Sequence, residues 1–212
     1  MTERFIVVVG TEEKEIPVIT SVATRSSVFF QTAMTHDWKE ARERRVALPD
    51  TKVEDFEGYL QWLYTGDITF YSSNRDLPLA RFYTAGDFLD DVKFRTAVLE
   101  AYMARLLSEG EVPGPSAVNY IWENTPSGSL LRQLTVELWM ALRFDKAVAH
   151  LFGRDPKLIQ YPREFAKEYF DGLVSLNAIM TSQKSHENIV ADFKLRMSGE
   201  GVVDDKGAEK TK

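Results

Sequence analysis

The chain has 212 residues, of which 44% are hydrophobic, and it carries a formal net charge of −6. This length suits one domain with an extension or two small domains, and the apolar content is ample for a packed core. The negative charge argues against direct nucleic-acid binding, which needs a concentrated basic surface, and the lack of cysteine excludes disulfides, zinc fingers and cysteine nucleophiles.

The sequence contains no stretch typical of a targeting or membrane segment. Only five apolar residues follow Arg4, too few for the apolar region of a signal peptide. No apolar run approaches the roughly 18 residues that a membrane span needs. We therefore expect a soluble intracellular protein, cytoplasmic or nuclear, with no membrane partner. The absence of cysteine fits a reducing compartment.

The first residues predict a β-hairpin. Residues 5–9 form an apolar run rich in valine, typical of a strand buried on both faces. Residues 15–19 can return as the second strand after a polar turn, and Pro17 indicates that this strand lies at an edge or ends there. Residues 45–50 read as a third strand.

Serine and threonine residues predict two short helices after the hairpin. Thr20 or Ser21 can cap the first helix, and Ser26 or Ser27 can cap the second. Residues 36–40 are expected to form a loop.

The stretch of residues 53–68, most of which is predicted to be a helix, is the centre of the pattern. Phe56, Leu60 and Leu63 recur at helical spacing, with Tyr59 beside them, so that one face is apolar and aromatic. On periodicity alone, this face is more typical of a buried core helix than of a partner surface.

Both ends of this helix carry stop or start signals. Asp50 or Thr51 can cap its start, and the acidic residues of its first turn suit the positive end of the helix dipole. Gly66 can end the helix as a C′ glycine, and the alternation over residues 67–70 predicts a short strand.

Several short sequence words resemble those of the BTB/POZ domain, a protein-interaction fold. In chain order they are Ser27, Phe29 and Phe30 within residues 18–30; Trp38-Lys39-Glu40; Leu48-Pro49-Asp50; Trp62-Leu63-Tyr64-Thr65-Gly66; and residues 82–89. The resemblance covers about residues 4–107 and is closest to stand-alone fungal BTB proteins. It implies an α+β fold, the BTB/POZ fold, in which a small three-to-four-stranded sheet lies beside a cluster of helices.

The rest of the chain predicts a helical extension. Residues 77–89 and 92–107 read as helices that complete the BTB part, which we place at residues 1–108. Prolines and glycines make residues 109–115 a linker. Apolar stripes then predict helices within 116–178.

The sequence changes again near the C-terminus. From residue 179 to 212 the composition is polar and charged, as in a flexible tail. Residues 189–195 allow a short partner-docking helix there as an alternative.

Nothing in the sequence indicates an enzyme. The three histidines lie in different segments, and neither a nucleophile elbow nor a glycine-rich phosphate loop occurs. Asp87, Asp90 and Asp91 have a spacing that allows a hard-cation site, but carboxylates near a helix end also fit a solvated face. We therefore predict no catalytic residue, no metal site and no cofactor.

The resemblance implies a protein-binding module with two known uses in the family, self-association and adaptor work on a cullin scaffold of a ubiquitin ligase. The family's cullin-facing surface would fall on Tyr59, Tyr64, Thr65 and Asp67. Aromatic side chains at an exposed helix end make good interface anchors, although Tyr64 can also pack inward. Many dimeric members of the family have an extra helix and strand before the hairpin, which they exchange between protomers. Because the hairpin starts near Arg4 here, we expect a dimer of this exchanged kind to be less favoured than in those members. The alternative is a transcription cofactor or self-assembling scaffold without its own DNA-binding part.

Overall fold

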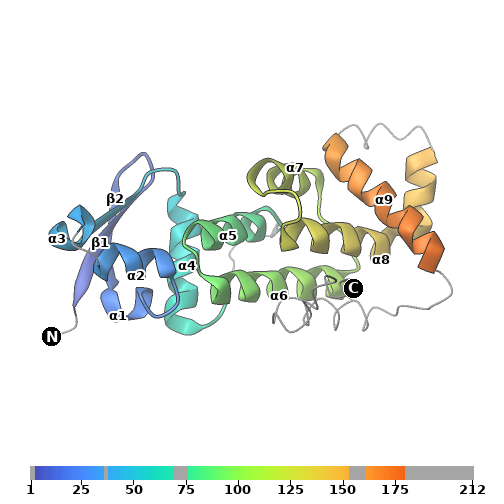
Figure 1. Ribbon diagram of the computed structural model, residues 1–212. Coiled ribbons are helices and arrows are strands. Elements are labelled where there is room, and N and C mark those ends of the chain that lie inside the picture. Colours follow the sequence, from blue (N-terminus) through green and yellow to red (C-terminus); the bar gives the residue numbers. More distant parts are fainter. Residues whose placement is uncertain (1–2, 36–37, 69–75, 153–160, 180–212) are drawn as a thin grey trace, which may run out of the picture.

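The computed structural model describes residues 3–35, 38–68, 76–152 and 161–179, with the helical backbone alone described for 142–152 and 174–179. At one end lies a three-stranded sheet with short helices, and longer helices extend from it (Figure 1). This is the expected α+β architecture.

The sheet is mixed and has the order β2-β1-β3. β1 (Arg4–Val9) pairs antiparallel with β2 (Lys14–Ile19) and parallel with β3 (Arg45–Leu48). β1 is central, and Phe5, Val7 and Val9 are buried in the core, which explains its nearly continuous apolar sequence. The predicted hairpin, the third strand and the edge position of Pro17 are all confirmed.

Three short helices lie between β2 and β3 in the chain, and two of their details differ from the prediction. α1 (Thr20–Ala23) has Ile19 at its N-cap and no side-chain cap, so the capping role predicted for Thr20 or Ser21 is wrong. α3 (Lys39–Glu43) begins within the loop expected over residues 36–40 and continues beyond it. It has no buried residue and therefore no apolar periodicity to reveal it.

Ser27 caps α2 (Val28–Thr35) as predicted. Its hydroxyl accepts the Phe30 N–H at 3.1 Å and donates to the Leu89 carbonyl at 2.7 Å. The cap therefore also ties the start of α2 to the chain at Leu89, far along the sequence.

The central helix α4 spans Val53–Thr65 and buries Phe56, Tyr59 and Leu63. Its N-cap is Lys52 with no side-chain cap, so the prediction of an Asp50 or Thr51 cap is wrong. The predicted stop is confirmed, because Gly66 adopts φ +79°, the left-handed conformation that favours glycine. Of the strand predicted over 67–70, residues 67 and 68 are described and are not in a strand, and residues 69 and 70 lie outside the described residues.

α5 (Asp76–Phe88) and α6 (Val92–Glu109) pack together beside α4, as Figure 1 shows. The ring of Phe82 on α5 lies against Gly58 of α4, where a Cβ would come within 2.0 Å of a ring carbon. Nearby, Arg81 donates to the buried Asp55 carboxylate at 2.9 Å. Burial raises the pKa of Asp55 above its usual range, against the opposing effect of Arg81.

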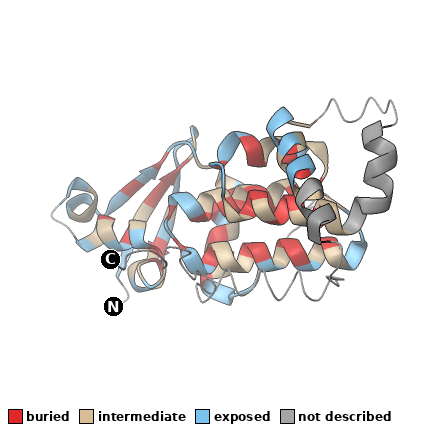
Figure 2. Cartoon of the chain, turned by 45° about the vertical axis from the view of Figure 1, so that its right-hand side comes forward, coloured by how far each residue is buried: buried red, intermediate tan, exposed pale blue. Residues whose placement is uncertain are grey.

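Three further helices continue the same core: α7 (Pro115–Asn124), α8 (Leu130–Phe152) and α9 (Arg163–Ile179). Buried residues run from the strands into the helices (Figure 2). The hydroxyls of Thr84 on α5 and Tyr120 on α7 are hydrogen bonded at 2.9 Å. The division into a BTB part at 1–108, a linker at 109–115 and an extension at 116–178 stays a prediction. The tail proposed for 179–212 lies almost wholly outside the described residues.

A buried arginine holds the connection between α7 and α8. Arg132 donates to the Trp122 carbonyl at 2.7 Å and to the Thr125 hydroxyl at 3.1 Å, and its guanidinium lies 5.2 Å from the Trp122 ring centroid. A buried charge is tolerated only when its donors are used, and here carbonyl and hydroxyl oxygens accept them.

Substitution of Gly58 should test the close contact between α4 and α5. We expect Gly58→Ala to lower the free energy of unfolding by about 1–3 kcal/mol, because the added methyl overlaps the Phe82 ring. Urea unfolding measures the change. Gly114→Ala is the matched control: nothing lies within 4 Å of its added Cβ, so its effect should stay below about 1 kcal/mol. Equal effects of the two substitutions would contradict the described packing.

Candidate partner-binding site

The four residues predicted to bind a partner do not share one environment. Tyr59 is fully buried, whereas Tyr64, Thr65 and Asp67 are exposed. The expectation that Tyr59 faces a partner is therefore wrong: its ring packs against Phe94, with ring centroids 4.9 Å apart. The three other residues form the corner at the end of α4.

The hydroxyl of Tyr59 belongs to a buried network centred on Asp91. The Asp91 carboxylate accepts the Tyr59 hydroxyl at 2.8 Å, the Ser26 hydroxyl at 2.6 Å and the Phe94 N–H at 3.0 Å. Burial, reinforced by the Asp91 charge, raises the pKa of Tyr59 far above its usual range. Tyr59 thus stays a neutral hydrogen-bond donor inside the core.

The corner after α4 is shaped by a threonine. The Thr65 hydroxyl donates to the Gln61 carbonyl at 2.8 Å and lies 3.1 Å from the Asp67 N–H, whose hydrogen bond it accepts. Together with the left-handed Gly66, these bonds turn the chain sharply and leave the Asp67 side chain in solvent.

Tyr64 projects from the last turn of α4 and is 50% exposed. Its hydroxyl accepts the Ile19 N–H at 3.3 Å, at the junction of β2 and α1. The ring is therefore held at the surface rather than packed inward, which was the open question for this residue.

A hollow of about 550 Å³ lies beside the corner. It is lined by three stretches of chain: the turn between α1 and α2, the end of α4 and the first turn of α6. The lining residues are Arg25, Ser26, Trp62, Leu63, Tyr64, Thr65, Gly66 and Lys93. Sequence reasoning missed Arg25 and Lys93, because no local pattern links two residues that only the fold brings together.

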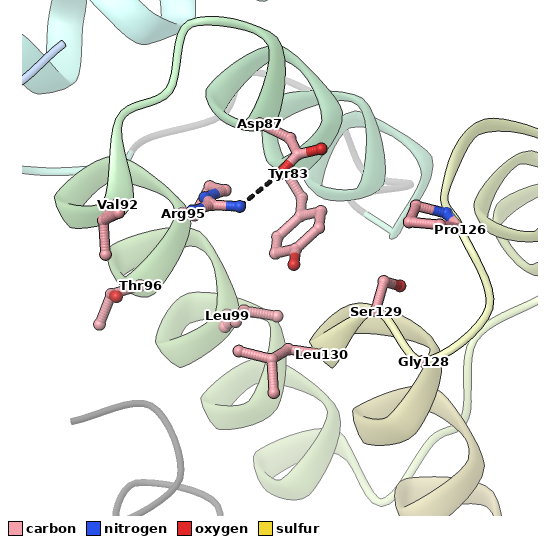
Figure 3. Close-up of a pocket in the computed structure, with 10 residues that line it drawn as sticks. All are labelled: Tyr83, Asp87, Val92, Arg95, Thr96, Leu99, Pro126, Gly128, Ser129 and Leu130. Atoms are coloured by element: carbon pink, nitrogen blue, oxygen red, sulfur yellow. Dashed lines mark hydrogen bonds and ion pairs between the residues drawn. The ribbon is translucent and has the colours of Figure 1, made fainter. Parts of the chain in front are cut away.

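Two other hollows lie farther along the molecule. One, of about 300 Å³, opens between α5, α6 and the start of α8; Figure 3 shows Asp87 and Arg95 paired across it and the Tyr83 ring pointing toward α8. The other, of about 360 Å³, lies between the start of α4, α5 and α7 and contains the Asp55–Arg81 pair.

The acidic residues near the α5–α6 turn do not converge on a cation. Asp87 pairs with Arg95, while Asp91 faces the core with its three donors. Among the described residues, no group of three His, Asp or Glu side chains is placed to hold a metal.

Comparison with protein families identifies the first part of the chain: residues 5–95 match the model of the BTB/POZ domain. This part of the chain therefore has the BTB/POZ fold. The match and the observed sheet with its helices agree with the fold expected from the sequence words. The matched region ends at residue 95, before the residue 107 at which the resemblance was expected to end. No curated protein matches the chain significantly.

BTB/POZ domains are generally non-enzymatic modules that bind other proteins and self-associate. None of the described helices is long and apolar enough to span a bilayer. The closeness to stand-alone fungal members stays a prediction.

Alanine substitution should separate the two tyrosines of α4. We expect Tyr59→Ala to cost about 3–5 kcal/mol of unfolding free energy, since it removes a buried ring and a donor to Asp91. Tyr64→Ala should cost less than about 1 kcal/mol, because half of that side chain already faces water. Thermal and urea unfolding measure both variants. A large loss of stability for Tyr64→Ala would assign Tyr64 to the core instead of the surface.

Proposed function

We propose that the α4 corner of this BTB/POZ protein, formed by Tyr64, Thr65 and Asp67, is the contact site for a partner protein. The observation that carries the proposal is the half-exposed Tyr64 ring beside a hollow of about 550 Å³. An aromatic side chain next to a concave surface buries much area on binding and loses few rotamers.

The sharper form of the proposal is a substrate adaptor for a cullin ubiquitin ligase. The BTB/POZ resemblance implies that the central helix and the residues after it bind the cullin. In this reading, helices α7–α9 carry the surface that recognises a second protein. Their placement beyond α5 and α6, away from the α4 corner (Figure 1), supports a division of the two tasks.

Isothermal titration of the purified full chain with the N-terminal domain of a cullin tests the adaptor role. We expect binding that Tyr64→Ala or Asp67→Lys weakens at least about tenfold, as for a central interface residue. Phe170→Ala is the matched control, because Phe170 is a 40% exposed aromatic residue on α9. It should leave the affinity within about twofold.

The possible outcomes separate the parts of the proposal. Absence of cullin binding by the unsubstituted chain would remove the adaptor role. Binding that tolerates Tyr64→Ala would remove the corner as the site. Sedimentation of the chain alone tests self-association, which would favour the scaffold alternative if it depended on Tyr64.

A further inference from the structure

The hollow at the α4 corner carries positive charge on a protein that is negative overall. Among the described residues, its lining includes the exposed cations Arg25 and Lys93 and no carboxylate, whereas the whole chain has a net charge of −6. Neither cation forms an ion pair with any residue in the described part of the chain. Their charges are therefore available to an incoming group.

Apolar and aromatic side chains, those of Trp62, Leu63 and Tyr64, also line the same hollow. Trp62 is partly buried, with its ring 5.0 Å from the Phe94 ring and 6.1 Å from the Tyr59 ring, so the core fixes its position. The Tyr64 ring is held in place because its hydroxyl accepts the Ile19 N–H. Rigid aromatic walls of this kind favour the insertion of an apolar side chain, because little conformational entropy is lost on binding.

The two chain segments that carry the cations are tied together by the buried network. Arg25 precedes Ser26, whose hydroxyl donates to Asp91, and Lys93 lies in the helix turn that Asp91 caps. One carboxylate thus links both segments of chain that carry the charges. This preorganisation reduces the entropy cost of placing two cations around one ligand.

We propose that this hollow binds an acidic peptide segment of a partner protein, with an aromatic or aliphatic side chain against Trp62 and carboxylates beside Arg25 and Lys93. The inference rests on the proposed function and states the chemistry of the partner. A volume of about 550 Å³ has room for such an anchor and its neighbours. A nucleic acid fits less well, because two cations cannot offset the repulsion of phosphates by an acidic protein.

Selection from a random peptide library displayed on phage tests the proposal with the full chain as bait. We expect the selected sequences to share Asp or Glu residues around an aromatic or aliphatic position. Arg25→Gln/Lys93→Gln should lose this selection, because it removes both charges. The matched control is Arg4→Gln/Lys52→Gln, which removes two exposed positive charges outside this hollow and outside α7–α9 and should keep it. Urea midpoints verify that both variants stay folded.

A selected peptide then gives a quantitative measurement. By fluorescence anisotropy, the neutralised hollow should bind it at least about tenfold more weakly, and the affinity of the unsubstituted chain should fall as salt is raised. Sequences without acidic residues, absence of any shared sequence, or full binding by Arg25→Gln/Lys93→Gln would overturn the inference. If Tyr64→Ala abolishes partner binding while the charge neutralisation does not, the proposed function survives and the acidic partner does not.

Discussion

The fold depends on one buried charge. The carboxylate of Asp91 is fully buried, and three donors from separate elements reach it: Ser26 before α2, Tyr59 in α4 and the Phe94 N–H in α6. A carboxylate in this position would be costly if it lacked partners. Each of the three elements must therefore hold its place for the others to be stable, and aromatic rings surround the network on the side of α4.

The same network explains why the molecular surface is well defined at the α4 corner. Tyr59 and Trp62 lie almost one turn apart on α4, and their rings pack at 6.1 Å from each other. The buried Tyr59 ring therefore fixes the position of the partly exposed Trp62 ring. The surface near Tyr64 therefore inherits its shape from the core, so that a change inside the protein, such as loss of the Tyr59 hydroxyl, would also disturb the corner.

Elements with a strong apolar pattern could be predicted from the sequence, and those without one could not. The continuous apolar run of β1 and the helical periodicities of α4, α5 and α6 result from burial, and each element appears close to its expected bounds. α3 buries nothing and was missed. The cap of α4 was misplaced because several polar residues precede the helix, and the sequence does not rank them.

The candidate site was predicted only in part, for a related reason. Phe56, Tyr59 and Leu63 occupy positions three and four residues apart, which place Tyr59 on the buried face, so the spacing itself contained the correction. Arg25 comes beside Lys93 only through the fold, with the long-range hydrogen bond from Ser26 to Asp91 tying the two segments together, and this has no counterpart in a local pattern.

The edge strand β2 restricts how a partner can approach this protein. Pro17 pairs with Ile6, and the Ile6 N–H donates to the Arg44 carbonyl on the opposite side of β1, at 2.9 Å. Pro17 is therefore at a position where the backbone polar groups of β2 face outward rather than toward β1. The donor that proline lacks is one that an added strand would need. Extension of the sheet by a foreign strand at β2 is thus disfavoured, so that a partner approaching this edge would have to be recognised by side chains rather than by added backbone hydrogen bonds.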